Sequence, residues 1–264
     1  MSLNEKIHFI HANGFPANAY KNLLNDINKD YNIIKFNLNK KKYLNIKDWT
    51  PFHKDFINTL NHNDKIIGIG HSIGGNIILR SALSNQSSFS KIILLDPTLF
   101  VPRIIFLWRL AMHLKIHNYL HPWVKATLKR RMNYENINEI LTSYRNKKVF
   151  SKINDENLSI YIKSIIKINT NKTLQITYPK ELEYQIYKTG LSADFYIWKN
   201  LKKLRIPCLI IRSKSSNAFL KSAATKVKKL NNNIKMIEID NSTHLFPLEI
   251  PEVISKYIVE FLKK

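Results

Sequence analysis

The chain has one cysteine and no long apolar run, and both shortages limit where it can work. Cys208 cannot form an internal disulfide and lies in an apolar strand pattern, which favours a reducing compartment. The first residues, Met1–Lys6, lead into a strand without the hydrophobic stretch of a secretory signal. The longest apolar candidate, Ile104–Met112, carries Arg109 and is far shorter than the ~20 residues that a membrane-spanning helix needs. The sequence therefore predicts a cytoplasmic protein.

Acidic residues are also scarce. The chain has 19 aspartates and glutamates but 42 lysines and arginines, which gives a formal net charge of +23. Such a charge raises the question of a nucleic-acid or membrane partner. The basic clusters are scattered and share no aromatic motif of the kind that RNA-binding sheets use: Lys40–Lys42, Lys129–Arg131, Lys202–Lys203 and Lys228–Lys229. The excess of lysine over arginine, in a chain also rich in asparagine and isoleucine, indicates codon bias. We expect no specific nucleic-acid partner and only weak association with anionic surfaces, and the composition leaves the oligomeric state open.

Apolar runs of strand length alternate with segments of helical spacing in the first and last parts of the chain. The expected strands are Lys6–Ile10, Tyr31–Leu38, Ile66–Gly70, Lys91–Leu95, Ile206–Arg212 and Ile234–Asp240. The expected helices between and after them are Ala17–Asn28, Ile46–Leu60, Ile73–Leu83, Asn217–Leu230 and Pro251–Leu262. This order predicts an α/β fold with a mostly parallel sheet and helices on both faces.

The alternation stops between about Pro97 and Leu204, where no convincing strand is found. The segments of helical spacing there are Pro102–His117, Pro122–Arg131, Ile137–Arg145, Leu158–Ile168 and Lys180–Lys188. We expect an all-helical cap over the C-terminal edge of the sheet, inserted after the strand that ends at Asp96. The predicted domains are a core of residues 1–97 and 205–264 and a helical cap of residues 98–204. Some of the cap's many aromatic residues should line an apolar substrate cavity.

The most informative stretch is Gly70-His71-Ser72-Ile73-Gly74, which joins an apolar strand to an apolar helix. Glycines flank the serine where a strand must reverse sharply into a helix and a Cβ would collide with the turn. Such a turn lifts the Ser72 hydroxyl above the sheet edge, and the Ile73 N–H at the helix start points to where an oxyanion would form. A dinucleotide-binding pattern begun at Gly68 would need glycine in place of Ile73, so it fits less well.

Three histidines have a spacing that could suit a metal site. His113, His117 and His121 recur every four residues in a segment of helical spacing. No neighbouring carboxylate or cysteine completes a ligand shell, and histidines on a polar surface are the simpler interpretation. We expect no metal and no other cofactor.

Three loops, Phe9–Pro16, Gly70–Gly75 and His244–Pro251, occur in an order that resembles the α/β-hydrolase superfamily, in its cap-bearing branch. They are similar to its oxyanion loop after the third strand, its nucleophile turn and its histidine loop before the last helix. The resemblance covers nearly the whole chain. Only Met1–Glu5 precede the first expected strand, so the N-terminal β-hairpin common in the superfamily is expected to be missing.

The resemblance implies that Ser72 is the nucleophile and His244 the base, but the acid departs from the commonest pattern. Many relatives place an aspartate after the strand that corresponds to Cys208–Arg212, and here the loop Ser213–Phe219 contains no carboxylate. The superfamily's other acid position is the end of the strand after the nucleophile strand, which here is Asp96. Adjacent parallel strands lie ~4.8 Å apart, so Asp96 could reach a histidine ring over the serine. An aspartate that only begins the turn before a proline is the alternative.

An oxyanion hole needs two N–H donors, and the resemblance assigns one to Ile73 and the other to the loop after the first strand. The second donor is Phe15 if Asn13-Gly14-Phe15 takes the place of the superfamily's His-Gly-x, with Asn13 as the alternative. The implied reaction is hydrolysis of a carboxylic ester or thioester of an apolar small molecule through an acyl-enzyme. The alternatives are carbon–carbon bond hydrolysis or perhydrolysis on the same triad, and a binding protein that keeps the hydrolase scaffold without catalysis.

Overall fold

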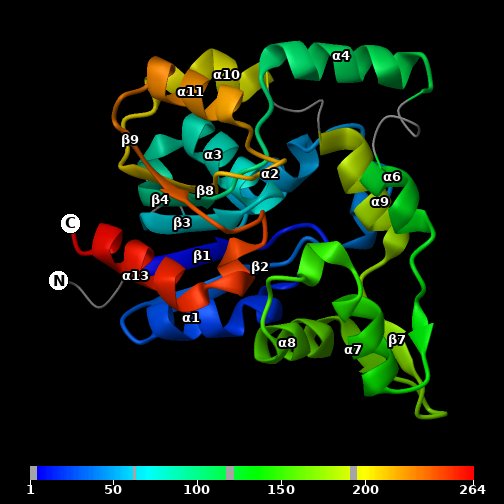
Figure 1. Ribbon diagram of the computed structural model, residues 1–264. Coiled ribbons are helices and arrows are strands. Elements are labelled where there is room, and N and C mark those ends of the chain that lie inside the picture. The colour runs from blue at the N-terminus through cyan, green and yellow to red at the C-terminus, as the bar shows by residue number, and fades with distance from the viewer. Residues whose placement is uncertain (1–4, 62–63, 117–121, 191–194) are drawn as a thin grey trace.

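The structure, a computed structural model, describes residues 5–61, 64–116, 122–190 and 195–264. A six-stranded sheet of order β2-β1-β3-β4-β8-β9 lies at its centre (Figure 1). The strands are β1 (Lys6–Ile10), β2 (Asn32–Phe36), β3 (Ile66–His71), β4 (Phe89–Leu95), β8 (Cys208–Ser213) and β9 (Ile234–Ile239). Every neighbouring pair is parallel, which confirms the predicted parallel sheet. The described residues begin at Glu5, one residue before β1, so the expected absence of an N-terminal hairpin stays a prediction.

Helices cover both faces of this sheet, because successive strand residues point to opposite sides. Ile92 and Leu94 belong to one hydrophobic cluster, and Ile93 and Leu95 belong to the other. The first cluster is covered by α2 (Thr50–Ile57), α3 (Ile73–Ser84), α10 (Phe195–Asn200) and α11 (Lys221–Leu230). The second is covered by α1 (Lys21–Asn28), which follows the short 3-10 turn η1 (Ala17–Tyr20), and by α13 (Pro251–Leu262). The core therefore consists of two apolar layers with the sheet between them (Figure 1).

Two glycines allow the closest approach in the fold, between β3, α3 and β1. A Cβ at Gly70 would lie 2.3 Å from the backbone carbon of Gly74. A Cβ at Gly74 would lie 2.1 Å from the carbonyl oxygen of Ile10, at the end of β1. Any side chain at either position would push the strand and the helix apart, so the tight turn depends on glycine.

The insertion between β4 and β8 differs from the expected all-helical cap. It contains α4 (Pro102–His113), α6 (Pro122–Leu128), α7 (Ile137–Arg145), α8 (Asp155–Ile165) and α9 (Lys180–Gly190). It also contains β5 (Asn133–Tyr134), β6 (Ile166–Ile168) and β7 (Leu174–Ile176), which form a small antiparallel sheet of order β5-β7-β6. The expectation of no strand here is wrong. The helix expected to reach Ile168 ends at Ile165, because the next isoleucines pair with β7 instead.

The last part of the insertion packs on the layer around the sheet. Ile197, Trp198 and Leu201 belong to the same hydrophobic cluster as the buried side of α3. In Figure 1, α10 lies beside α11 above α3. The division into core and cap at residue 204 stays a prediction. Within the described parts of the chain, no helix combines the length and apolar character that a membrane crossing requires.

We predict that Gly74→Ala destabilises the protein by about 1–3 kcal/mol, because the added methyl group overpacks a backbone contact that cannot rotate away. Urea unfolding measures the change. Lys54→Ala, at an exposed position of α2, serves as the control and should change the free energy of unfolding by less than about 0.5 kcal/mol. A Gly74→Ala protein as stable as this control would contradict the packing argument.

Candidate active site

Ser72 occupies the sharp turn between β3 and α3 in a strained backbone conformation. Its φ angle is 58°, in the left-handed region that non-glycine residues rarely adopt. The turn is held by its own backbone, since the Ser72 N–H donates to the Leu95 carbonyl at 2.9 Å and its carbonyl accepts from the N–H of Thr98 at 3.0 Å. These bonds fasten the serine to the end of β4.

The structure brings the three predicted residues Ser72, His244 and Asp96 together. The His244 Nε2 atom lies 2.9 Å from the Ser72 Oγ atom, and the His244 Nδ1 atom lies 2.6 Å from the Asp96 Oδ2 atom. Ser72 follows β3, Asp96 follows β4, and His244 follows β9, so all three come from C-terminal ends of parallel strands. Asp96 is fully buried, whereas the His244 side chain keeps 22% of its surface exposed.

The donor of each hydrogen bond that links Ser72, His244 and Asp96 can be assigned from the chemistry of the three side chains. A carboxylate only accepts hydrogen bonds, so the proton between His244 and Asp96 belongs to Nδ1. The Nε2 atom of a neutral imidazole is then an acceptor, and the Ser72 hydroxyl donates to it. In this arrangement the serine proton already points at a base.

Thr98 is a second neighbour of the serine hydroxyl, and the sequence analysis missed it. Its Oγ1 atom lies 3.1 Å from the Ser72 Oγ atom. Because the serine proton faces His244, the Thr98 hydroxyl is the donor in this contact. The Thr98 carbonyl accepts from the Asn76 side chain at 2.8 Å, which fixes the residue against α3. Its place two residues after Asp96 was the only available signal.

Ser216 is the second residue that the sequence analysis missed. Its hydroxyl donates to the Asp96 Oδ2 atom at 2.5 Å and accepts from the Phe219 N–H at 2.9 Å. Ser216 lies in the loop after β8, the loop in which the commonest superfamily pattern has its aspartate. The loop therefore contributes a hydroxyl group to the buried acid instead of supplying an acid itself.

His71, the residue before the serine, links the three loops of the site. Its Nε2–H donates to the His244 carbonyl at 2.9 Å, and its Nδ1 atom accepts from the Tyr20 hydroxyl at 2.6 Å. The Tyr20 oxygen in turn accepts from the Ala12 N–H at 3.2 Å. Burial holds the pKa of His71 well below its usual value of 6.5, with a further contribution from nearby His244, so the ring is neutral. A neutral imidazole has one N–H donor and one acceptor nitrogen, so His71 can make both of these hydrogen bonds at once.

The predicted oxyanion donors differ in whether they already donate a hydrogen bond within the protein. Ile73 is the first residue of α3, so its N–H has no acceptor within the helix. The Phe15 N–H donates to the Ala12 carbonyl at 3.1 Å and could serve an oxyanion only as a shared donor. The Asn13 amide nitrogen donates to the Glu183 carbonyl at 3.1 Å, and its oxygen accepts from Tyr178. Their roles in an oxyanion hole stay predictions.

The insertion contacts the loop that carries Asn13, Gly14 and Phe15. The Glu183 carboxyl group of α9 lies 3.3 Å from where a Cβ of Gly14 would be, and it is paired with Arg130. Burial raises the pKa of Glu183, although the Arg130 guanidinium opposes that shift. The Phe15 ring stacks on the Tyr161 ring with their centres 4.7 Å apart. Movement of the insertion would therefore move this loop.

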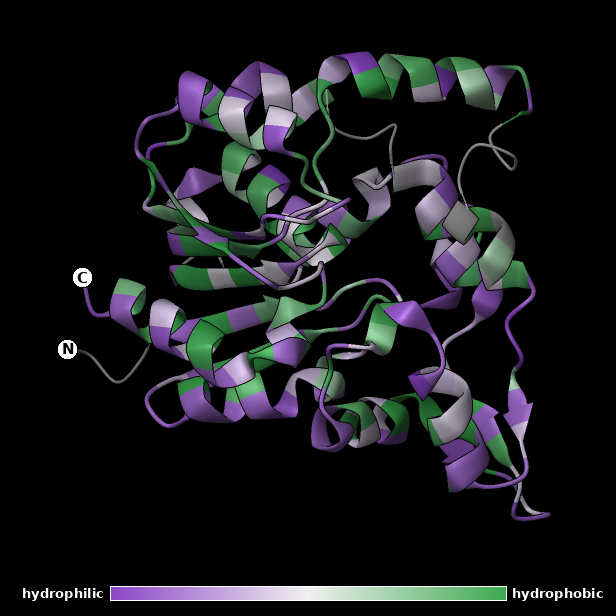
Figure 2. Ribbon diagram, in the orientation of Figure 1, coloured by the Kyte–Doolittle hydropathy of each residue, from purple (hydrophilic) through white to green (hydrophobic). Residues whose placement is uncertain are grey.

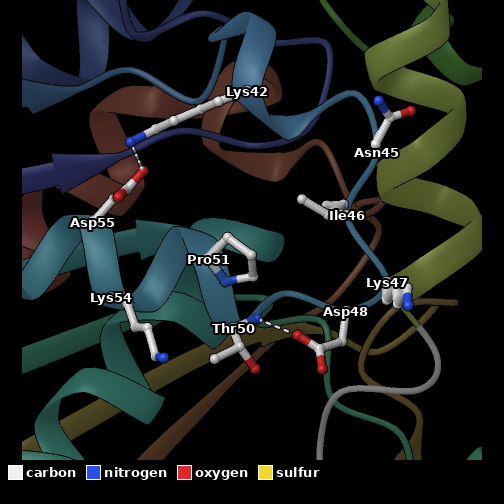
Figure 3. Close-up of a pocket in the computed structure, with 9 residues that line it drawn as sticks. All are labelled: Lys42, Asn45, Ile46, Lys47, Asp48, Thr50, Pro51, Lys54 and Asp55. Carbon is white, nitrogen blue, oxygen red and sulfur yellow. Dashed lines mark hydrogen bonds and ion pairs between the residues drawn. The ribbon is translucent and has the colours of Figure 1, made fainter.

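A cavity of about 550 Å³ lies away from these residues, along the segment from Lys42 to Asp55 (Figure 3). Several of its polar groups bind one another: Lys42 forms an ion pair with Asp55 at 2.5 Å, and Asp48 accepts a hydrogen bond from the Thr50 N–H at 2.7 Å. It contains none of the predicted site residues. No cluster of three or more metal-binding side chains occurs in the described ranges, and His117 and His121 lie outside those ranges.

Comparisons with known proteins identify the family of the chain. The sequence profile of the family described as serine aminopeptidase, S33, matches residues 43–246. An uncharacterized hydrolase of Bacillus subtilis (strain 168), YugF, is 24% identical over 199 residues, which span 74% of this chain and 64% of that relative. The chain thus matches less than two thirds of that relative's length.

Solved structures share the fold at low sequence identity. E-2-(acetamidomethylene)succinate hydrolase superposes with a TM-score of 0.77 at 18% identity, covering 98% of this chain and 92% of the other. The thioesterase domain from the curacin biosynthetic pathway gives a TM-score of 0.71 at 14% identity, with coverages of 98% and 92%. These likenesses confirm the predicted α/β-hydrolase fold.

We predict that the free energy of unfolding falls as the pH drops below 6.5, partly because His71 stays neutral in the folded protein while an unfolded histidine takes up a proton. In His71→Gln this loss should be shallower, by up to about 1.4 kcal/mol per pH unit. Urea unfolding between pH 7 and the low-pH limit of folding measures both slopes. Glutamine can keep both hydrogen bonds, and the other histidines are common to both proteins. Equal slopes would contradict a neutral buried His71.

Proposed function

The chain belongs to the serine aminopeptidase S33 family of α/β-hydrolases, and we propose that it is a serine hydrolase that cleaves a carboxylic ester or thioester of an apolar small molecule. The observation that carries this proposal is the continuous hydrogen-bonded chain from Ser72 through His244 to the buried Asp96. A thioesterase domain and a succinate-derivative hydrolase are among the proteins of similar fold, which supports hydrolysis in general terms.

An ester or thioester is favoured over a peptide by the charges near the predicted oxyanion loop. An aminopeptidase must bind the ammonium group of its substrate, and a free carboxylate is the natural partner for that group. The Glu183 carboxylate lies against Gly14, but the Arg130 guanidinium already pairs with it. A carboxylate neutralised in this way is a poor receptor for a second cation.

In the proposed acylation step, the Ser72 Oγ atom attacks the substrate carbonyl carbon and its proton passes to the His244 Nε2 atom. The electron pair of the carbonyl π bond moves onto oxygen, where the Ile73 N–H and a shared Phe15 N–H would stabilise the negative charge. The Asp96 carboxylate stabilises the imidazolium formed. Collapse of the intermediate expels the alcohol or thiol, which takes the proton from His244.

In the proposed deacylation step, a water molecule gives a proton to His244 and attacks the acyl carbon. The Ser72 Oγ atom leaves and takes that proton back, which regenerates the resting hydroxyl. Thr98 donates to the same oxygen and would stabilise its partial negative charge in both steps. Ser216 and His71 would act indirectly, by fixing Asp96 and the His244 backbone.

We further infer that residues 98–204 form the cap that selects the substrate, because this insertion already encloses the predicted oxyanion loop. Tyr161 stacks on Phe15 and donates to the Gly14 carbonyl at 3.4 Å. The stacked Phe15 and Tyr161 rings give this loop an apolar neighbour, which favours an apolar acyl or alcohol group.

Reaction with a fluorophosphonate probe tests the nucleophile. We predict stoichiometric labelling of the wild-type protein on Ser72, loss of labelling in Ser72→Ala, and turnover of short-chain aryl esters by the wild type alone. Screening acyl chains of increasing length, as esters and as thioesters, then separates the substrate classes. Folded wild-type protein that neither reacts with the probe nor cleaves any ester would sink the proposal.

Replacing the acid tests the third member of the triad. Asp96→Asn should lower kcat by about 10³- to 10⁴-fold, because an amide can hold the imidazole in the wrong tautomer and cannot stabilise the imidazolium. The matched control is Asp240→Asn, at an exposed position after β9. An Asp96→Asn enzyme with nearly full activity would remove Asp96 from the triad and leave Ser72 unaffected as the nucleophile.

A further inference from the structure

Helix α4 presents a row of large apolar side chains to solvent. Phe106 is 63% exposed, Leu107 53%, Leu110 46% and Leu114 55%. Large apolar groups are rarely this exposed next to one another on a water-soluble surface. The helix lies along the outer edge of the molecule in Figure 1, and its hydrophobic bands are visible in Figure 2. This row, Phe106, Leu107, Leu110 and Leu114, is called the α4 face below.

The α4 face is distinct from the side that holds the helix on the protein. Ile105, Trp108 and Ala111 are buried on the opposite side. The Trp108 indole N–H donates to the Lys188 carbonyl of α9 at 3.0 Å, which fastens this side. Leu110 lies three positions after Leu107, four after Phe106 and four before Leu114, which is the spacing of one side of an α-helix. The helix is therefore apolar on both sides, although only one of the two sides is buried against the protein.

The charged residues of the chain segment that carries the α4 face are of one sign. No aspartate or glutamate occurs between Asp96 and Glu135, a stretch that contains seven lysines and arginines. Arg103 and Lys115 are exposed at the two ends of the helix. An apolar row flanked by cations is the pattern of a helix that lies in the interface of an anionic membrane, where leucine and phenylalanine enter the acyl region and cations contact lipid phosphates.

We propose that the α4 face docks on the surface of an anionic lipid bilayer. The charge complementarity selects this partner over a second copy of the chain, since two α4 helices facing each other would bring their arginines and lysines together across the interface. Docking needs no catalysis and thus goes beyond the proposed hydrolysis. It would place the segment that joins Thr98 to Pro102, and with it the edge of the candidate active site, close to apolar molecules dissolved in the bilayer.

Flotation with vesicles tests the proposal. We expect the wild-type protein to float with phosphatidylcholine vesicles that contain phosphatidylglycerol, to float less with pure phosphatidylcholine, and to be released partly by high salt. Phe106→Ser with Leu110→Ser should lower the affinity for the anionic vesicles by at least about tenfold, because two apolar anchors are lost while every charge stays. Ile168→Ser, at a 73% exposed position of β6, is the matched control and should bind like the wild type.

Three results would overturn docking by the α4 face. The first is a wild-type protein that stays in solution with anionic vesicles. The second is a double variant that floats like the wild type, in which case scattered lysines alone account for binding. A dimer seen by light scattering that the double variant abolishes, without vesicle binding, would assign the α4 face to a second copy. Fluorophosphonate labelling of Ser72 in every variant reports the hydrolase site separately, so docking and hydrolysis can fail independently.

Discussion

The fully buried carboxylate of Asp96 is the constraint on which the candidate site depends. A charge without solvent must be hydrogen-bonded, and here His244 and Ser216 both donate to the same oxygen. The two donors belong to loops after different strands, so their hydrogen bonds to the Asp96 Oδ2 atom tie those loops together. The serine turn is joined to them by the hydrogen bond from the Ser72 N–H to the carbonyl of Leu95, which is the last residue of β4 and directly precedes Asp96. The three loops are thus positioned by one buried group.

The sheet and the serine turn could be predicted from sequence because both rest on local patterns. The apolar run that ends the buried strand Phe89–Leu95, and the glycines around Ser72, leave traces that a single sequence carries. The assignment of Asp96 needed the resemblance to the superfamily, since only the absence of a carboxylate after β8 pointed back to it. Its hydrogen bond to His244 agrees with that choice, while the catalytic role awaits measurement.

The parts that escaped prediction depend on contacts across the fold. The strands of the small sheet have two or three residues, too few to show a period of two, and their isoleucines read equally well as the end of a helix. Thr98 and Ser216 are ordinary loop hydroxyls until β3, β4 and β8 bring them to Ser72 and Asp96. The turn that occupies the Phe15 N–H likewise follows from the positive φ of 76° at Gly14, which the sequence only permits.

The position of Ser216 has a consequence for the charge inside the site. Its hydroxyl lies 2.5 Å from the Asp96 carboxylate, in the loop where many superfamily members have their acid. An aspartate at that position would put two carboxylates in contact inside the protein, and one of them would have to take up a proton. The two positions therefore cannot both hold an ionised carboxylate within one molecule. Serine is a neutral side chain, so it leaves the negative charge to Asp96 alone.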